Sequence, residues 1–194
     1  MNDGLLRFWM IYDFIYQHLT RIEYVDKENG NIFRVVFCKY RGPKLVTHDG
    51  VEINNGDPIV KLHIYNYKLT KMLKGIDNDI KLGLTALKIV KNSLPGLARY
   101  VEQHPKGENV KAIIGTTILH RGVSKLGFDV EYVPNKLRYK IKNKYLIFLL
   151  SLIHPDGRKR IKRRQEELTL KRVYISKEHL LNLYFHSKQL EEQV

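Results

Sequence analysis

The apolar residues of this sequence repeat with two different periods, and the order of those periods limits the possible folds more than any other feature. A period close to 3.6, typical of amphipathic helices, runs over residues 5–19 and 79–102. Strand-like patterns occupy residues 32–40, 59–65, 110–118, 128–133 and 168–175. Because strands and helices do not alternate regularly, we expect an α+β fold, with a mixed or antiparallel sheet packed by several helices.

Local signals divide these elements further. Pro95-Gly96 predicts that the long helix splits into two segments, since proline lacks the N–H that a helix interior needs. Residues 119–126 predict a short helix that Gly127 ends in a left-handed conformation. A last helix is expected to begin at Ser176 as its N-cap and to run toward Gln189.

The segment from residue 136 to 153 is predicted to begin as an extended chain and to end as a helix. Leu137, Tyr139 and Ile141 alternate with cations, which would place four cations in a row on one side; these are Lys136, Arg138, Lys140 and Lys142. Asn143 is predicted to cap an apolar helix over residues 144–153.

The chain has 194 residues and no Ser- or Pro-rich linker, so we expect one domain over residues 1–194. Cys38 is its one cysteine, which excludes an intramolecular disulfide and a multi-cysteine metal cluster. No apolar run reaches the roughly 18–20 residues of a spanning helix, and no secretory signal is expected. We therefore predict a soluble, cytoplasmic protein that can touch the inner face of the membrane, with no metal and no cofactor.

Positive charge is concentrated near the C-terminal end. The formal net charge is +14, and residues 135–172 hold 13 Lys or Arg against 3 Asp or Glu. A dense basic surface repels itself unless an anionic partner neutralises it. The expected partners are an anionic glycan, lipid head groups or another phosphate-bearing ligand.

Candidate residues for that ligand fall in two places. Arg121 and Lys125 are four apart on the predicted short helix, where they could hold a phosphate with the backbone N–H groups of a turn at Gly115-Thr116-Thr117. A second candidate is the run over residues 158–164, which follows the apolar stretch 145–153, an arrangement typical of membrane-surface segments; its cations are Arg158, Lys159, Arg160, Lys162, Arg163 and Arg164.

Whether the chain catalyses a reaction is left open by the sequence. Nucleotide-binding, serine hydrolase and zinc protease motifs are absent. His63 and His120 are the candidate catalytic residues, because an imidazole can act as a general base and the two could converge if their strands share a sheet. The enzymatic alternative is a transferase or hydrolase of sugar or lipid phosphates. A second alternative is a nucleic-acid-binding protein that uses the basic face of residues 136–172.

Several stretches resemble the YkoP-like domain, a bacterial family found alone or C-terminal to polysaccharide deacetylases. The stretches are Asp49-Gly50 with Gly56-Asp57, Leu62-His63-Ile64-Tyr65-Asn66, Gly115 to Gly122, Leu126 to Val130, His154-Pro155-Asp156-Gly157 and Val173 to Leu181. The resemblance implies a link to cell-envelope or polysaccharide metabolism and no known catalytic residue. Together with the charge, it favours a non-catalytic accessory module that binds an anionic ligand.

Overall fold

A mixed six-stranded sheet, in the order β1-β2-β5-β6-β8-β7, forms the centre of the computed structural model, which describes residues 22–24, 31–76, 78–153 and 168–186. Strands β5 and β6 run parallel, and the other neighbouring pairs run antiparallel. The α+β prediction is therefore confirmed. The strands are β1 (Glu23–Tyr24), β2 (Phe33–Lys39), β5 (Pro58–Ile64), β6 (Ala112–Thr117), β7 (Asp129–Tyr132) and β8 (Lys171–Ser176).

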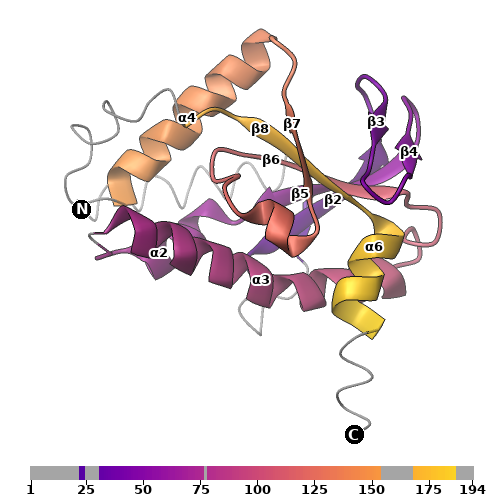
Figure 1. Ribbon diagram of the computed structural model, residues 1–194, viewed down its shortest axis with the longest axis horizontal. Helices are drawn as coiled ribbons and strands as arrows, with labels where there is room; N and C mark the ends of the chain where they lie inside the picture. Colours follow the sequence, from indigo (N-terminus) through magenta and orange to yellow (C-terminus); the bar gives the residue numbers. More distant parts are fainter. Residues whose placement is uncertain (1–21, 25–30, 77, 154–167, 187–194) are drawn as a thin grey trace, which may run out of the picture.

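Helices and a small hairpin cover this sheet. The hairpin joins β3 (Leu45–Val46) to β4 (Glu52–Ile53). In Figure 1, α2 and α3 lie below the sheet, whereas α4 lies above it. The helical elements are α2 (Asn66–Leu73), α3 (Asp79–Gln103), the 3₁₀ helix η1 (Val123–Leu126), α4 (Leu137–Ile153), α6 (Lys177–Leu181) and the π-helix η2 (Asn182–His186). The predicted helix over residues 5–19 lies outside the described residues.

The period of two in the strands separates two differently packed faces of the sheet. One face, with Val35, Val60, Ile113 and Ile175, packs on the buried side of α3 in the main core. On the opposite face Ile59, Ala112, Ile114 and Tyr174 pack on Leu45 and Ile53 of the hairpin. The hairpin covers only part of that opposite face, and α4 approaches another part.

Helix α3 passes through Pro95 without interruption, so the prediction of two segments is wrong. Leu94, Leu97, Ala98 and Val101 are fully buried on either side of the proline. Burying four apolar side chains on one continuous helix outweighs the hydrogen bond that proline removes, which costs about 3 kcal/mol.

The strand predicted over residues 137–142 is also wrong, because α4 begins at Leu137 and runs to Ile153. Asn143 therefore lies inside this helix and does not cap it. Leu137 and Ile141 are four apart, so they fit a helix as well as a strand, and the apolar run that follows extends the helical pattern. The four cations consequently do not form a row on one side.

The region after β6 differs from the prediction as well. Gly115, Thr116 and Thr117 pair with β8 inside the sheet and form no turn. The short helix is limited to η1, because Gly122 before it has φ 84°. Arg121 precedes that glycine and Lys125 follows it, so the two do not share a helix face. Gly127 does end the element in the left-handed conformation, with φ 83°, as predicted.

Candidate functional site

A cavity of about 1270 Å³ extends around the C-terminal ends of β5 and β6, where residues of both faces of the sheet line it together with α4 and the first half of α3. Most small-molecule sites measure roughly 300–1,000 Å³, so this volume suits a large ligand. Residues of β5, β6 and β8 line it from the sheet, and residues of α4 line it from above. The site is built from segments that lie far apart in the sequence.

The charged residues that line the cavity are of one sign. Among the described residues, the lining includes nine Lys or Arg and no Asp or Glu. Such a surface attracts anions, and low-dielectric walls strengthen the attraction. The nine are Arg34, Lys39, Arg41, Lys61, Arg121, Lys125, Arg138, Lys142 and Arg172.

Sheet register explains how several of these cations reach one face. Residues directly opposite each other on neighbouring strands point to the same side. Arg34 on β2 lies opposite His63 on β5, and Thr116 on β6 lies opposite Arg172 on β8. Lys61 is two residues before His63, so it shares this face. These polar residues lie on the face opposite α3, which we call the cationic face.

Lys142 of α4 points toward the cationic face. Its Nζ donates a hydrogen bond to Oγ1 of Thr116, 26 residues earlier in the chain. Burial and the positive charge of Lys61 together lower the pKa of Lys142 to about 8. A lysine in this position carries an electrostatic cost that a bound anion would relieve. The neighbouring Ile141 also lines the cavity, although it is 60% exposed.

His63 lies on the same cationic face and is uncharged at neutral pH. Burial, followed by the charges of Lys142, Lys61 and Arg34, lowers the pKa of His63 to about 3. A general base works best when its pKa is near the working pH. A neutral imidazole with so low a pKa is better suited to hydrogen bonding than to proton abstraction.

Two arginines of the cationic face have structural partners. Arg172 is buried, and its guanidinium donates hydrogen bonds to the Tyr40 hydroxyl and to Glu131, at 3.0 and 3.2 Å. Arg34 is also buried and stacks over the ring of Tyr65 at 3.5 Å from its centroid. Both side chains are therefore held in place and add positive potential to a fixed surface.

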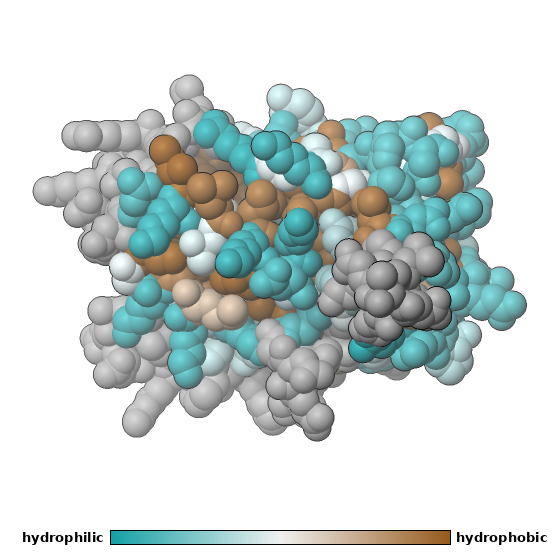
Figure 2. Space-filling model, turned by 60° about the horizontal axis from the view of Figure 1, so that its bottom comes forward, coloured by the Kyte–Doolittle hydropathy of each residue, from teal (hydrophilic) through white to brown (hydrophobic). Residues whose placement is uncertain are grey.

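Apolar residues line the rest of the cavity. Leu82, Leu87 and Val90 come from α3, and Leu146 and Leu150 come from α4. Two further lining residues, Ile80 and Leu84, are 74% and 63% exposed. Figure 2 views the molecule from the α2–α3 side, where hydrophobic residues form a tract between hydrophilic margins. The cavity thus joins a cationic part to an apolar part.

The structure brings some of the sequence-predicted site residues together and separates others. His63, Arg121 and Lys125 line the cavity. His120 is not among its lining residues; burial, then the charges of Lys171 and Arg121, lower the pKa of His120. The cations from Arg158 to Arg164 lie outside the described residues.

Lys142, Thr116 and Lys61 were not predicted as a site from the sequence. Lys142 appeared only as one of four cations on a predicted strand. The helical alternative carried a usable signal, because a 3.6 period places Arg138 and Lys142 on one side and the exposed apolar residues on another. The contact between Lys142 and Thr116 depends on how α4 packs, which no local pattern encodes.

The described part of the chain holds neither a membrane-spanning helix nor a cluster of metal-binding side chains. None of its helices combines the length and apolar character that a membrane crossing requires. None of its His, Cys, Asp and Glu side chains form a group of three or more that could hold a metal ion.

Comparison with known proteins supplies the family. A family model described as the YkoP domain matches residues 2–184. The uncharacterized protein YkoP of Bacillus subtilis (strain 168) is 38% identical over 130 residues, which span 67% of this chain and 71% of that protein. No solved structure matches the chain. By the extent of the family match and by this relative, the chain belongs to the YkoP domain family.

Proposed function

We propose that this protein binds an anionic amphiphile, a lipid with a phosphate head group, in the cavity between the cationic face and α4. The phosphate lies at Lys142 and Lys61, and the apolar part of the lipid extends along α3 and α4. This proposal names a ligand for the non-catalytic accessory module that the sequence predicts. It rests first on Lys142, a largely buried ammonium whose neighbouring charge is another cation.

Electrostatics supports an anion as the ligand. Lys142 and Lys61 repel each other, and Thr116 offers Lys142 a neutral hydroxyl in place of a carboxylate. A phosphate oxygen between the two ammonium groups would replace that repulsion with charge-assisted hydrogen bonds, each contributing about 1.5–3 kcal/mol. A bound phosphate would thus neutralise part of the positive charge of the cationic face, which gives this charge a function.

The apolar lining supports a lipid over a free sugar phosphate. A sugar phosphate presents polar groups throughout, and burying its hydroxyls against Leu82, Leu87 and Leu150 would leave them without hydrogen bonds. An acyl chain gains about 0.8 kcal/mol for each buried CH₂ group. A ligand with one charged end and one apolar end matches both parts of the cavity.

The outer side of α4 supports binding at a membrane surface. Leu137 and Phe148 are 72% and 44% exposed, and neither lines the cavity. A helix turns about 100° per residue, so these two side chains lie within a sector of ~20°. Exposed lysines at positions 140 and 144 lie beside them. An apolar stripe accompanied by lysines is typical of helices that lie on anionic membranes.

The two alternatives from the sequence draw less support from the described residues. The low pKa of His63 disfavours it as a general base, and His120 does not line the same cavity. A nucleic-acid interface would present its cations on an open surface, whereas Lys142 is turned into a cavity with apolar walls.

Calorimetric titration of a soluble short-chain phosphatidate into the full chain tests the proposal. Dioctanoyl phosphatidate is expected to bind, whereas dioctanoyl phosphatidylcholine and glucose 6-phosphate are expected to bind at least tenfold more weakly. Lys142→Met should weaken phosphatidate binding by about 10- to 100-fold, because a charge-assisted contact is lost.

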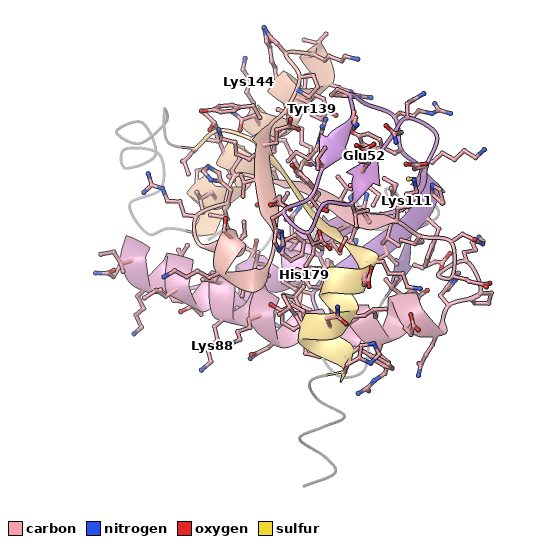
Figure 3. The ribbon with its side chains drawn as sticks, turned by 45° about the vertical axis from the view of Figure 1, so that its right-hand side comes forward. Glu52, Lys88, Lys111, Tyr139, Lys144 and His179 are labelled. Atoms are coloured by element: carbon pink, nitrogen blue, oxygen red, sulfur yellow. The ribbon has the colours of Figure 1, made fainter. Side chains whose placement is uncertain are left out.

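Lys144→Met is the matched control, since Lys144 lies on the same helix, does not line the cavity and points away from it (Figure 3). Equal affinity for phosphatidate and phosphatidylcholine would contradict the proposal, as would a Lys142→Met variant that binds as well as the unsubstituted chain. Tighter binding of glucose 6-phosphate than of phosphatidate would instead support the alternative function, a transferase or hydrolase of sugar phosphates.

A further inference from the structure

A pair of histidines outside the cavity brings two ring nitrogens close together. His48 lies in the turn of the β3–β4 hairpin, and His179 lies on α6, 131 residues later. Their Nε2 atoms are 3.2 Å apart, and the ring planes are inclined at 83°. Figure 3 places His179 where the first turn of α6 approaches the hairpin. The two nitrogens therefore meet at a junction between separate parts of the fold.

Asp129, at the start of β7, fixes the orientation of His48. Its Oδ2 accepts hydrogen bonds from the backbone N–H and from Nδ1 of His48, at 3.0 and 3.1 Å. Because a carboxylate only accepts, Nδ1 of His48 carries the proton and Nε2 of the neutral ring keeps its lone pair. The carboxylate–imidazole arrangement that orients metal-ligating histidines in many proteins is thus already present.

The position of His179 is fixed as well. Its backbone N–H donates to Oγ of Ser176 at 2.9 Å, and the same Oγ donates to Oδ2 of Asp49 at 2.5 Å. This chain of hydrogen bonds ties the hairpin to the start of α6, beside His48. Gly127 leaves room for the ring, since a Cβ at this position would lie 3.1 Å from Nε2 of His179.

We propose that His48 and His179 bind a divalent transition metal through their Nε2 atoms, with Zn²⁺ as the ion that suits them best. Zinc–nitrogen bonds of about 2.0–2.1 Å at a tetrahedral angle place two ligand nitrogens roughly 3.3 Å apart, close to the observed separation. Asp129 is a positioning residue for His48. The remaining coordination positions are taken by water or by an external ligand, since the described residues supply no third His, Cys, Asp or Glu ligand.

Exposure and chemistry agree with this assignment. The His48 side chain is 46% exposed, so an ion in solvent can reach the pair. Imidazole nitrogen suits zinc, copper and nickel and does not suit magnesium or calcium. Without metal, Nε2 of His179 donates its proton to Nε2 of His48. With metal, His179 carries its proton on Nδ1, and the rings, whose centroids are 4.4 Å apart, rotate so that both lone pairs face the ion. Metal binding needs both rings neutral, so affinity falls at acid pH.

The test is calorimetric titration of Zn²⁺ into the full chain without a histidine tag, with Mg²⁺ as a negative control. One zinc ion is expected to bind, His48→Ala and His179→Ala should each remove that binding, and Asp129→Asn should weaken it by about 10- to 100-fold. His186→Ala is the matched control, because His186 is exposed on the adjoining η2 and is expected to leave zinc binding unchanged.

A second readout needs no substitution. Zinc should shift the imidazole nuclear magnetic resonance signals of His48 and His179 in the unsubstituted chain and leave those of His186 in place. Three results would overturn the proposal. The folded chain could fail to bind zinc, zinc could still bind to both alanine variants, or zinc could shift only the signals of other histidines. Because the pair lies outside the cavity, none of these results depends on the lipid ligand.

Discussion

The Nζ of Lys142 reaches across from α4 and donates a hydrogen bond to Oγ1 of Thr116 on the central strand β6. This contact joins α4 to the cationic face of a cavity whose described lining contains no Asp or Glu. A structural lysine usually gains a carboxylate partner or stays in solvent. Lys142 does neither in the described structure, which is the reason for treating its surroundings as a ligand site.

Lys142→Met is expected to leave the unliganded protein as stable as before or to stabilise it. The pKa of Lys142 is about 8 in the fold, below its usual 10.5. The unfolded chain therefore binds the proton more readily, and the charged form costs stability below about pH 8. Methionine keeps the length of the side chain and removes that cost, so the free energy of unfolding at pH 7 should rise by on the order of 1 kcal/mol.

Urea denaturation at pH 7 and pH 10 measures this effect. In the unsubstituted chain the cost should fall as the pH rises from about 8 toward 10.5, so the difference between the two proteins should shrink at pH 10. A purely structural role for Lys142 predicts the opposite, a clear loss of stability in Lys142→Met at both pH values.

His63→Leu is expected to make the protein less sensitive to acid. The pKa of His63 is about 3 in the fold, against 6.5 in the unfolded chain. Between these values the unfolded state binds a proton that the folded state does not, so stability is lost as the pH falls from 6.5 toward 3. The contribution of His63 is on the order of 2–3 kcal/mol between pH 6.5 and pH 4.

The free energy of unfolding is measured for the unsubstituted chain and for His63→Leu from pH 6.5 to pH 4. Both proteins share the same carboxylates, so the difference between them gives the contribution of His63. A difference that stays constant from pH 6.5 to pH 4 would show that His63 titrates alike in both states. His186→Leu provides the comparison for an exposed histidine.

Leu137→Ser combined with Phe148→Ser is expected to weaken binding to anionic vesicles. Both side chains are exposed on the outer side of α4, and each would lose about 1 kcal/mol of apolar contact with the membrane interface. Sedimentation with vesicles containing phosphatidylglycerol measures the partition, and about a tenfold decrease or more is expected. Met72→Ser is a suitable control, since Met72 is an exposed apolar residue on α2; an equal decrease there would contradict a specific role for α4.

Gly127→Ala is expected to destabilise the fold more than Gly75→Ala. Both glycines have positive φ, 83° and 86°, so each alanine adds a similar backbone strain of roughly 1 kcal/mol. A Cβ on Gly127 would also lie 2.6 Å from Leu183, whereas a Cβ on Gly75 meets nothing within 4 Å. The melting temperature of Gly127→Ala should therefore be lower than that of Gly75→Ala. Equal melting temperatures would show that the crowding at Gly127 is easily relieved.

Local patterns in the sequence were sufficient to predict most of the sheet. Strands β2, β5, β7 and β8 overlap their predicted ranges, because β-branched and aromatic residues are frequent in these runs. Ser176 also caps α6 as predicted, by accepting a hydrogen bond from the N–H of His179. Sequence reasoning missed α2, where Asn66 to Leu73 offers too short a pattern for an amphipathic helix to stand out.

The candidate site could be predicted only in part. The orientation of His63, away from the aliphatic face of β5, follows from alternation alone, and it does place His63 in the cavity. The position of Lys142 could not be predicted, because the apolar pattern of residues 137–142 fits both a strand and a helix. Only the packing of the folded chain determines which of the two forms. The His48–His179 contact joins residues 131 positions apart, and such a distance in sequence leaves no local signal.

The most direct measurement is the pKa of the Lys142 ammonium group, with and without dioctanoyl phosphatidate, followed by nuclear magnetic resonance of the labelled side chain. We expect a pKa of about 8 in the free protein, and a rise to 10 or above at saturation, because a bound phosphate favours the charged form. A pKa that stays near its free value while phosphatidate is bound would contradict a head group at Lys142.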